Sequence, residues 1–474
     1  MIKAQRAIVH LGCGAFFRAH QARYLHLLRE QGSDWYYIAM NIGSARSAEK
    51  VQQLRQQDFR YHLLERDVEQ EQLYEISSLQ GAMHPTLDGI EALITQIAAP
   101  EVAIISLTIT EKGYCLDNSS GELDVTHPDI AHDIAHPHQP KTAIGYLVAG
   151  LQQRFTQQRA PLSVMSCDNL QHNGDKIRRA VITFAAQLNP LLAEWIRKNI
   201  SFPNTMVDRI VPAVTEQTLR LVAERAGRFD PLALSCEGFS QWVIEDHFVA
   251  GRPEWEKVGV QFAADVTPYE LMKLRMLNGS HSFLAWLGYL AGYKTIADTI
   301  ADPNFKQAVT AFLTDEQIPT LTPPPGIDLT EYGQQLLHRF TNPAIQHQTG
   351  QIASDGSQKL SQRLIDPLLG QLQQQQHYQW QTLAVAAWVQ YIQGVDDNGQ
   401  SFTVVDPLAT TLQNIIASRT SQVEIVEDLL RLKSIFGSDL PTQRAWVDKL
   451  VTLVNTLHQS GAKQTLHQLL AETH

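Results

Sequence analysis

The chain has 474 residues, of which 44% are hydrophobic and 18% are charged, and its formal net charge is -11 at pH 7. Such a chain can bury large hydrophobic cores, and its length predicts two domains. The acidic balance argues against nucleic acid or an anionic membrane as a partner, because both are bound by basic surfaces.

The sequence shows no membrane span, secretion signal or metal motif. No run of about 18 apolar residues occurs, and residues 7–11 already read as a strand. The four cysteines form no CxxC pair, which favours reduced thiols in the cytoplasm. The histidines of residues 127–138 lie among Pro and Asp without an HExxH arrangement. We therefore expect a cytoplasmic, metal-independent protein.

The first predicted strand, residues 7–11, leads into Gly12-Cys-Gly14 and then a helix. Two glycines let the backbone turn tightly and approach a pyrophosphate, and the helix points its free N–H groups and positive dipole end at that anion. The third glycine of the usual GxGxxG pattern is missing, because position 17 is Phe. The segment predicts a dinucleotide site with Gly12 and Gly14 among its cofactor-binding residues.

Further strands are predicted at residues 35–40, 101–108 and 162–166, each followed by polar or helix-compatible sequence. Alternation of strands and helices predicts a parallel sheet with helices on both faces. We therefore assign residues 1–265 to an α/β, Rossmann-like dinucleotide-binding domain.

Polar residues follow two of these strands, where ligands of parallel sheets bind. Each of them is also a common helix cap or turn residue. The candidates are Thr108, Thr110 and Glu111 after one strand and Asp168 and Asn169 after another.

The end of the second strand lacks the Asp or Glu that usually binds the ribose of NAD. Asn41 could bond a ribose hydroxyl instead, and Arg46 could equally bind the 2′-phosphate of NADP. The residues alone leave the choice between NAD and NADP open.

Long apolar-periodic segments, such as residues 269–293 and 406–436, follow Pro268, with few strand signals. This pattern predicts a mainly α-helical C-terminal domain over residues 266–474, which we expect to carry the substrate and catalytic residues.

Lys273, Asn278 and His281 begin this second domain. On a helix with about 100° per residue, Asn278 lies roughly 140° around from Lys273 and His281 roughly 80°, so the three side chains can converge. A neutral amine can accept a proton, while amide and imidazole N–H groups can hold an oxygen that gains negative charge. Free lysine has a pKa of about 10.4, so the lysine needs burial or a nearby cation to act as a base. The alternative is an amphipathic helix whose polar residues face water.

The chain resembles the polyol-specific long-chain dehydrogenases and reductases, the mannitol dehydrogenase family. The resemblance implies an NAD-dependent enzyme, expected to be a monomer, in which Lys273 is the acid and base and Asn278 and His281 bind the reacting oxygen. It also implies cofactor contacts by Phe16 and Arg18 and positioning roles for Asn169 and Asp208. The matching segments are Gly12-x-Gly14-x-Phe16-x-Arg18-Ala-His20, Ser106-Leu-Thr-Ile-Thr-Glu-Lys-Gly-Tyr114, Cys167-Asp-Asn169, Thr205-Met-Val-Asp-Arg209 and Lys273-x4-Asn278-x2-His281.

Within the family, the segments Lys273-Leu-Arg-Met-Leu-Asn-Gly-Ser-His-Ser-Phe-Leu284 and Asp355-Gly-Ser-Gln-Lys359 are most similar to the uronate-reducing branch. The resemblance implies interconversion of D-fructuronate and D-mannonate in hexuronate catabolism. Alternatives within the family are tagaturonate reduction and oxidation of mannitol or arabinitol. An alternative of another class is a catalytically inactive nucleotide-binding sensor, since a fold alone does not fix a function.

Three further residues are candidates for substrate binding or positioning. Glu270 lies three residues before Lys273, on nearly the same helical face, and could hold or relay its proton; it could equally be a surface acid paired with a surface lysine. An acidic substrate needs a cation, and Lys359 or Arg363 could bind its carboxylate through a charge-assisted hydrogen bond.

Overall fold

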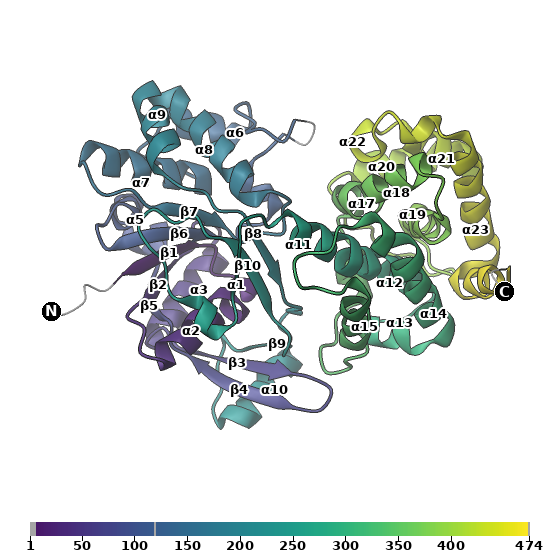
Figure 1. Ribbon diagram of the computed structural model, residues 1–474, viewed down its shortest axis with the longest axis horizontal. Coiled ribbons are helices and arrows are strands. Elements are labelled where there is room, and N and C mark those ends of the chain that lie inside the picture. Colours follow the sequence, from purple (N-terminus) through teal and green to yellow (C-terminus); the bar gives the residue numbers. More distant parts are fainter. Residues whose placement is uncertain (1–5, 118–119, 473–474) are drawn as a thin grey trace. The chain divides into compact units, whose positions relative to one another are not determined.

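The computed structural model describes residues 6–117 and 120–472, which form two compact units, one ending at Thr267 and the other beginning at Pro268. The first unit combines strands and helices, and the second consists almost entirely of helices (Figure 1). The α/β, Rossmann-like N-terminal domain and the helical C-terminal domain predicted from the sequence are therefore confirmed.

The first unit is built on a five-stranded parallel sheet with the order β5-β2-β1-β6-β7. The predicted apolar strand before the glycines is its central strand, and the edge strand β5 had no clear sequence signal. The strands are β1 (Ala7–Leu11), β2 (Tyr36–Met40), β5 (Leu79–Met83), β6 (Val102–Leu107) and β7 (Ser163–Ser166).

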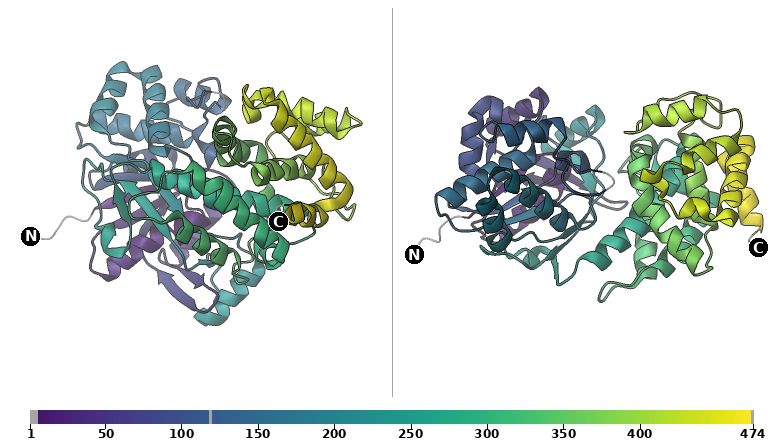
Figure 2. Two further views of the ribbon diagram at one scale, coloured as in Figure 1. Left: turned by 45° about the vertical axis from the view of Figure 1, so that its right-hand side comes forward. Right: turned by 90° about the horizontal axis from the view of Figure 1, so that it is seen from above.

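Helices cover both faces of this sheet (Figures 1 and 2). The side chains of each strand alternate between the two faces, so each face packs against its own layer of helices. Val9 and Leu11 of β1 share a core with α5 (Ile90–Ile97), α7 (Ala143–Thr156) and α8 (Asn173–Leu188). Ile8 faces the opposite core, with α1 (Ala15–Ala19), α2 (Gln21–Glu30) and α3 (Ala45–Gln56). The carboxyl ends of the strands lead into connecting loops, and the glycine turn is the loop that follows β1.

Two small three-stranded sheets complete the first unit, and the sequence patterns did not predict them. Their orders are β4-β3-β9 and β11-β10-β8. Their strands are β3 (Tyr61–Arg66), β4 (Glu71–Ile76), β8 (Thr205–Asp208), β9 (Leu234–Glu237), β10 (Gln241–Glu245) and β11 (Gln261–Ala263). The remaining helical segments are α4 (Pro85–Asp88), η1 (Glu111–Tyr114), α6 (Pro128–Ala135), α9 (Pro190–Asn199), α10 (Glu216–Ala226) and η2 (Trp255–Val258).

The second unit packs its helices around α19 (Gln379–Tyr391), whose residues from Trp380 to Tyr391 are all buried. A helix that is apolar on all sides must lie inside a core. The other helical segments from Thr267 onward are α11 (Thr267–Met272), η3 (Lys273–Asn278), α12 (Gly279–Leu290), α13 (Ile296–Ala301), α14 (Pro303–Ala311), η4 (Phe312–Gln317), η5 (Ile318–Thr320), α15 (Leu329–Phe340), α16 (Thr349–Ala353), α17 (Gly356–Leu360), η6 (Ser361–Ile365), α18 (Asp366–Gln373), α20 (Ala409–Ala417), α21 (Gln422–Leu430), α22 (Lys433–Phe436), η7 (Leu440–Thr442) and α23 (Arg444–Glu472).

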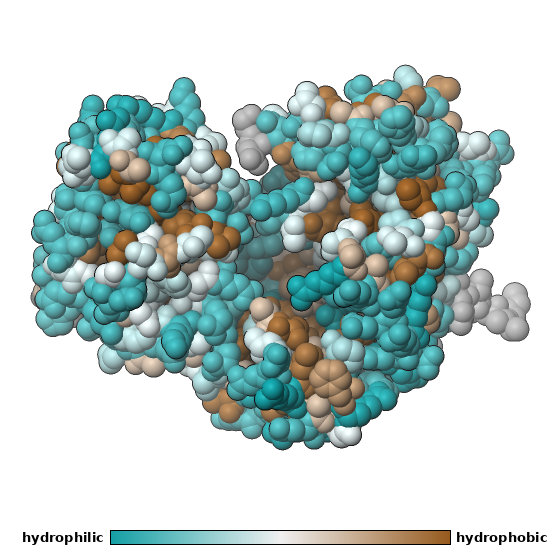
Figure 3. Space-filling view, turned by 180° about the vertical axis from the view of Figure 1, so that it is seen from behind, coloured by the Kyte–Doolittle hydropathy of each residue, from teal (hydrophilic) through white to brown (hydrophobic). Residues whose placement is uncertain are grey.

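The large apolar side chains lie mainly in the cores. One face of the molecule shows mostly hydrophilic residues, with hydrophobic residues in smaller patches (Figure 3). Leu191 and Phe229 are among the few large apolar residues that are mostly exposed. Over the described part of the chain, no helix is long and apolar enough to span a bilayer.

Candidate active site

The glycine turn after β1 has no room for a side chain at its first position. Gly12 has a φ of +98°, and a Cβ built there would lie 2.1 Å from the carbonyl oxygen of Thr108. The Gly12 amide donates to the carbonyl of Met40 at 2.8 Å, and the Gly14 amide donates to the carbonyl of Gly12 at 2.7 Å. The turn therefore presents bare backbone ahead of α1, as a pyrophosphate site requires.

His10, which was not predicted as a site residue, forms hydrogen bonds that support this turn. Its Nδ1 lies 2.8 Å from Ser106 Oγ, and its Nε2 lies 2.9 Å from Thr108 Oγ1 and 3.2 Å from the carbonyl of Gly12. Because a carbonyl can only accept, Nε2 carries the proton. Burial lowers the pKa of His10 to about 3, so the ring is neutral. Phe17, in place of the third glycine, stacks on it with ring centroids 3.6 Å apart.

Asn41, just after β2, contacts the glycine turn, and the following helix α3 carries basic residues. Asn41 Oδ1 accepts a hydrogen bond from the Cys13 amide at 2.8 Å, so the side chain predicted to bind ribose also braces the turn. Arg46 is exposed at the start of α3. Burial and then the charge of Arg18 lower the pKa of Lys50 on the same helix, and Arg46 adds to this effect. Basic side chains thus gather beside the glycine turn.

Arg18 and Phe16, which were predicted to contact the cofactor, are buried to different degrees. Arg18 is buried; it donates to the carbonyl of Leu232 and lies over the ring of Tyr61, 5.3 Å from its centroid. Phe16 is half-buried and stacks on His20 with ring centroids 5.0 Å apart. Arg18 therefore fixes α1 in place, and Phe16 keeps part of its ring at the surface.

Asp168 connects the ends of β6 and β7. Its carboxylate accepts hydrogen bonds from the amides of Ile109 and Thr110, both at 2.9 Å, and from the hydroxyl of Tyr114 at 2.6 Å. Burial raises the pKa of Asp168 to about 6, although these donors oppose the shift. Thr110 has a φ of +63°, an uncommon conformation that the carboxylate holds. Two other predicted residues of this edge are exposed: Glu111 and Asn169.

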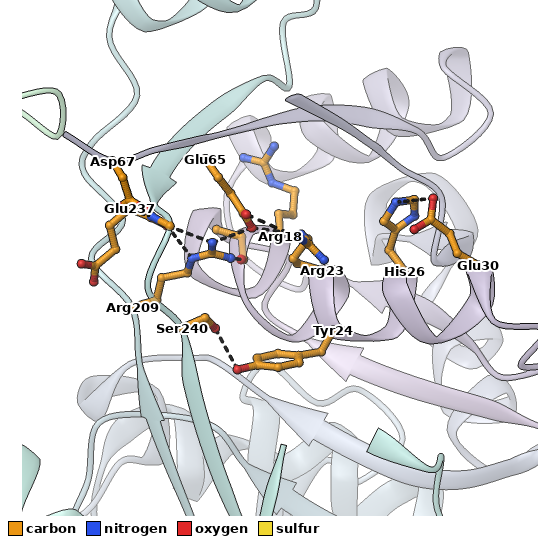
Figure 4. A network of polar contacts seen from close by, with 12 residues as sticks. Arg18, Arg23, Tyr24, His26, Glu30, Glu65, Asp67, Arg209, Glu237 and Ser240 are labelled. Carbon is orange, nitrogen blue, oxygen red and sulfur yellow. Dashed lines mark hydrogen bonds and ion pairs between the residues drawn. The ribbon is translucent and has the colours of Figure 1, made fainter. Parts of the chain in front are cut away.

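Asp208 is the last residue of β8 and is buried. The residue after it, Arg209, holds this end of the strand in place. The Arg209 side chain is 1% exposed and forms an ion pair with Glu65 at 2.5 Å (Figure 4). It also donates to the carbonyl of Ala19 at 2.6 Å and to that of Glu237 at 2.9 Å. Arg209 thereby ties β8 to α1, β3 and β9, which positions the Asp208 carboxylate.

Lys273, Asn278 and His281 lie on one helical run of the second unit, and all three are less than one-tenth exposed. The assumption of a regular α-helix was wrong, because Lys273–Asn278 forms a π-helical turn. Hydrogen bonds of a π-helix join residues five apart, so Asn278 lies about one turn beyond Lys273, on nearly the same side. Glu270, within α11, is also buried. The amine and the amide are therefore closer than regular spacing predicts.

Two buried polar atoms of this set have no hydrogen-bond partner among residues 6–117 and 120–472: Asn278 Nδ2 and His281 Nε2. The His281 ring packs on Phe340 with ring centroids 4.6 Å apart. Burial lowers the pKa of His281 well below its ordinary value, and His347 and Arg339 add to this effect. A neutral imidazole and an amide can thus bond a group from outside the chain.

Arg363 is the nearest of the predicted cations to these residues. It lies in the π-helical turn η6 and donates from Nη1 to the carbonyl of Asn278 at 3.3 Å and to Ser282 Oγ at 3.1 Å. Its charge is another cause of the lowered His281 pKa. Arg363 therefore contacts the helix that carries the predicted catalytic residues.

Lys359, the other predicted cation, lies on α17. Its Nζ donates to the carbonyls of Ile352 at 2.9 Å and of Ser354 at 2.5 Å. The Lys359 charge also lowers the pKa of His347. Lys359 thus belongs to the same group of basic side chains as Arg363, while part of its hydrogen bonding goes to the backbone.

The comparisons with known families agree with this arrangement of two units. The model of the mannitol dehydrogenase Rossmann domain matches residues 6–257, and that of the mannitol dehydrogenase C-terminal domain matches residues 265–458. The chain belongs to the mannitol dehydrogenase family. Membership of this family makes it an oxidoreductase, and it confirms the resemblance drawn from the five sequence segments.

Individual members of the mannitol dehydrogenase family match almost the whole chain. D-mannonate oxidoreductase of Escherichia coli (strain K12) is 47% identical over 468 residues, 98% of this chain and 96% of that protein. The uncharacterized oxidoreductase YdfI of the same strain is 44% identical over 97% of this chain and 94% of its own length. The structure of Pseudomonas fluorescens mannitol 2-dehydrogenase in a ternary complex with NAD and D-mannitol has a TM-score of 0.92 and 40% identity, covering 99% of this chain and 95% of that one.

The histidine-rich segment of this family member holds no cluster suited to a metal. His132 and His136 lie with ring centroids 4.9 Å apart, and His132 Nδ1 lies 3.0 Å from Asp133 Oδ1. Throughout the described ranges, no three His, Cys, Asp or Glu side chains are grouped so that they could hold a metal ion.

Proposed function

We propose that this protein is an NAD-dependent fructuronate reductase, also called D-mannonate oxidoreductase, which interconverts D-fructuronate and D-mannonate. The observation that carries the proposal is a neutral, buried His281 with an unpartnered Nε2 on the same helical run as Lys273 and Asn278, surrounded by cationic side chains. The basic surroundings suit an acidic substrate, and the 47% identity to an E. coli D-mannonate oxidoreductase supports that choice.

The first unit has the features that a nicotinamide dinucleotide requires. The Gly12 backbone leaves a space that a Cβ would fill, and Gly14 follows it. Asn41 and Thr108 brace this turn, and Asp168 holds the loop that carries Thr110. A nicotinamide held there would supply or accept the hydride of the reaction. We assign the pyrophosphate to the glycine turn and the neighbouring ribose and nicotinamide contacts to the edge residues Phe16, Thr110, Glu111 and Asn169. Arg18 is buried and donates to the Leu232 carbonyl, so it would support α1 behind them.

Lys273 moves the proton. In reduction, its ammonium group gives a proton to the oxygen of the substrate carbonyl as negative charge develops there, and in oxidation the neutral amine takes the proton from the hydroxyl. The side chain is 8% exposed, so bulk water has little access to the proton. Glu270 is buried one turn earlier and would relay protons to Lys273, while Asn169 and Asp208 would position substrate or cofactor hydroxyls.

Asn278 and His281 stabilise the reacting oxygen. Asn278 Nδ2 carries two N–H groups, and His281 Nε2, when protonated in the neutral tautomer, donates a third. Donors that are fixed before charge develops lower the barrier by about 3 kcal/mol each in other enzymes. Their hydrogen bonds are stronger to the oxyanion than to the carbonyl, so their loss should reduce kcat more than it raises KM.

The test is NADH oxidation measured in parallel with D-fructuronate, D-tagaturonate and D-fructose, and repeated with NADPH. The proposal expects strong turnover of D-fructuronate with NADH. Preference for D-fructose would instead favour a mannitol 2-dehydrogenase, the second candidate, which the 40% identity and TM-score of 0.92 to the P. fluorescens enzyme support.

The same assay on Lys273→Ala tests whether the protein catalyses at all. We expect turnover to fall by about 10²–10⁴-fold, the usual contribution of a general acid or base, while NADH still binds. A wild-type protein that binds NADH, turns over none of the three sugars and oxidises neither mannitol nor arabinitol with NAD would favour a nucleotide-binding sensor.

A further inference from the structure

A second histidine stands beside the predicted oxygen-binding site. The rings of His281 and His347 meet edge to face, with centroids 5.1 Å apart and an interplanar angle of 84°. His347 Nδ1 is buried and has no hydrogen-bond partner within the described ranges. The pair therefore presents two unpartnered ring nitrogens, His281 Nε2 and His347 Nδ1, in one region of the second unit.

The fold fixes the backbone that carries His347. The residue lies in the connection between α15 and α16, and its carbonyl accepts a hydrogen bond from the Ile296 amide at 3.0 Å. The next residue, Gln348, pairs with Thr295 in an isolated β-bridge. Gln346, just before, has a φ of +50°, which turns the chain into this contact. The histidine is thus held on both sides at the start of α13.

The charges around the two rings favour an anion. Burial and then the Lys359 charge lower the pKa of His347 to about 4, so the ring is neutral at physiological pH. Arg339, Arg363 and Lys273 lower the pKa of His281. Each charged group that shifts either ring is therefore a cation. A carboxylate placed there would receive an N–H donor and would be attracted by several positive charges.

We propose that His347 is the specificity-determining residue that binds the carboxylate of the sugar acid, donating from Nδ1, while the Lys359 ammonium supplies the nearby charge. The inference rests on the proposed function and names the side chain that distinguishes an acid from a neutral sugar. In D-fructuronate four bonds separate the keto carbon from the carboxylate carbon, roughly 5 Å when the chain is extended. A keto oxygen at His281 would then bring the carboxylate to a ring 5.1 Å away.

His347 suits this contact better than the two cations predicted from sequence. The Arg363 guanidinium donates to the Asn278 carbonyl and to Ser282, which orients it toward the helix. The Lys359 amine donates to two backbone carbonyls of the α16 region. Both contribute charge, whereas the buried Nδ1 of His347 is the donor without a partner in the described structure.

The experiment compares His347→Asp and His347→Asn with the wild type, using D-fructuronate and D-fructose with NADH. These sugars differ in having a carboxylate or a hydroxymethyl group at the same end. A like charge beside the carboxylate costs several kcal/mol, so His347→Asp should raise KM for D-fructuronate by about tenfold or more. KM for D-fructose should stay within about twofold, so the ratio of the two KM values is the readout. The new carboxylate also lies beside His281, so kcat should fall by a similar factor for both sugars.

His338→Asp is the matched control, because this histidine is exposed on α15. It should leave both KM values unchanged. His347→Asn keeps a neutral side chain and should shift the KM ratio in the same direction as His347→Asp but less, so the test stands even if the Asp variant does not fold.

The outcomes separate this inference from the proposed function. Wild-type turnover of D-fructuronate with an unchanged KM ratio in both His347 variants would overturn the His347 assignment alone. Turnover of D-tagaturonate in place of D-fructuronate, with the ratio of acid to neutral sugar lost in His347→Asp, would overturn the proposed substrate and support the carboxylate contact. Turnover of D-fructose alone would overturn both.

Discussion

Arg363 donates a hydrogen bond from Nη1 to the backbone carbonyl of Asn278, 3.3 Å away, so one π-helical turn holds the end of another. A π-helical turn shifts the hydrogen-bond pattern of the helix by one residue, and carbonyls at its end need partners outside the regular ladder. The same guanidinium reaches Ser282 on α12. Arg363 therefore stabilises the irregular backbone that sets the direction of the Asn278 amide.

Replacing Arg363 by Met should reduce kcat for acidic and neutral sugars alike. The substitution keeps most of the volume and removes both hydrogen bonds, and a displacement of about 1 Å in a positioned group can cost about 100-fold in rate. Steady-state kinetics with D-fructuronate and D-fructose would measure it. A loss confined to D-fructuronate would contradict this positioning role and would make Arg363 the carboxylate ligand.

Gly12→Ala should weaken NADH binding far more than Gly14→Ala. The new Cβ at residue 12 would lie 2.1 Å from the Thr108 carbonyl oxygen at a φ of +98°, whereas the nearest atom to a Cβ at residue 14 is 3.9 Å away. A left-handed conformation alone costs roughly 1–2 kcal/mol, which corresponds to about five- to thirtyfold in affinity. Titration of protein fluorescence with NADH gives both dissociation constants. Equal effects at the two glycines would mean that the nucleotide does not depend on this close approach.

Sequence patterns could predict the central sheet because its strands are apolar and flanked by turn or helix signals. Ala7–Leu11 is buried along its whole length and leads directly into the glycines, so both strand and turn could be found. The edge strand Leu79–Met83 contains Gln80 and Gly81 and gives no such signal. His10 did carry a signal, a histidine inside an apolar strand, but its partners Ser106 and Thr108 come from a strand about 100 residues away.

The helix with the three predicted catalytic residues shows which part of the geometry sequence patterns could not predict. The residue types and order of Lys273, Asn278 and His281 could be found from sequence, but their directions depend on a π-helical turn that no Gly or Pro marks. Two further π-helical turns among the described residues of the second unit, η4 and η6, both contact η3. Tertiary packing rather than local propensity therefore sets this geometry, and the same packing brings His347 to His281.

The buried neutral histidines should make the folded state sensitive to acid. The pKa of His10 is about 3 in the folded state against 6.5 for the free side chain, so the unfolded chain binds more protons between these values. Stability contributed by His10 is present above about pH 6.5 and is lost as the pH falls toward 3. Each pKa unit corresponds to about 1.4 kcal/mol, which makes this effect on the order of a few kcal/mol.

Thermal unfolding of wild type and His10→Asn between pH 7 and 4 would measure that contribution. The variant should melt at a lower temperature at pH 7 and should lose less stability on acidification. Asp168 and Glu316 act in the opposite direction, because burial raises their pKa values to about 6 and about 7. The difference between the two proteins removes those contributions. Parallel curves for the two proteins would contradict the assignment of the acid sensitivity to His10.

Arg209→Met should destabilise the first unit strongly. The guanidinium is buried against Glu65, and breaking a buried ion pair typically costs about 3–5 kcal/mol. Arg23 still pairs with Glu65 at 2.9 Å, so we expect the lower end of this range. Two backbone carbonyls, those of Ala19 and Glu237, would also lose their donor. The loss should appear in chemical denaturation of the whole chain as a lower midpoint of the first transition.

Arg225→Met is the matched control for this prediction. Arg225 pairs with Glu71 at 3.0 Å, but its side chain is 53% exposed, and an exposed pair contributes about 0–1 kcal/mol. If the two arginine variants unfold at the same denaturant concentration, the Arg209 network does not stabilise the end of β8, and Asp208 must be positioned by other contacts.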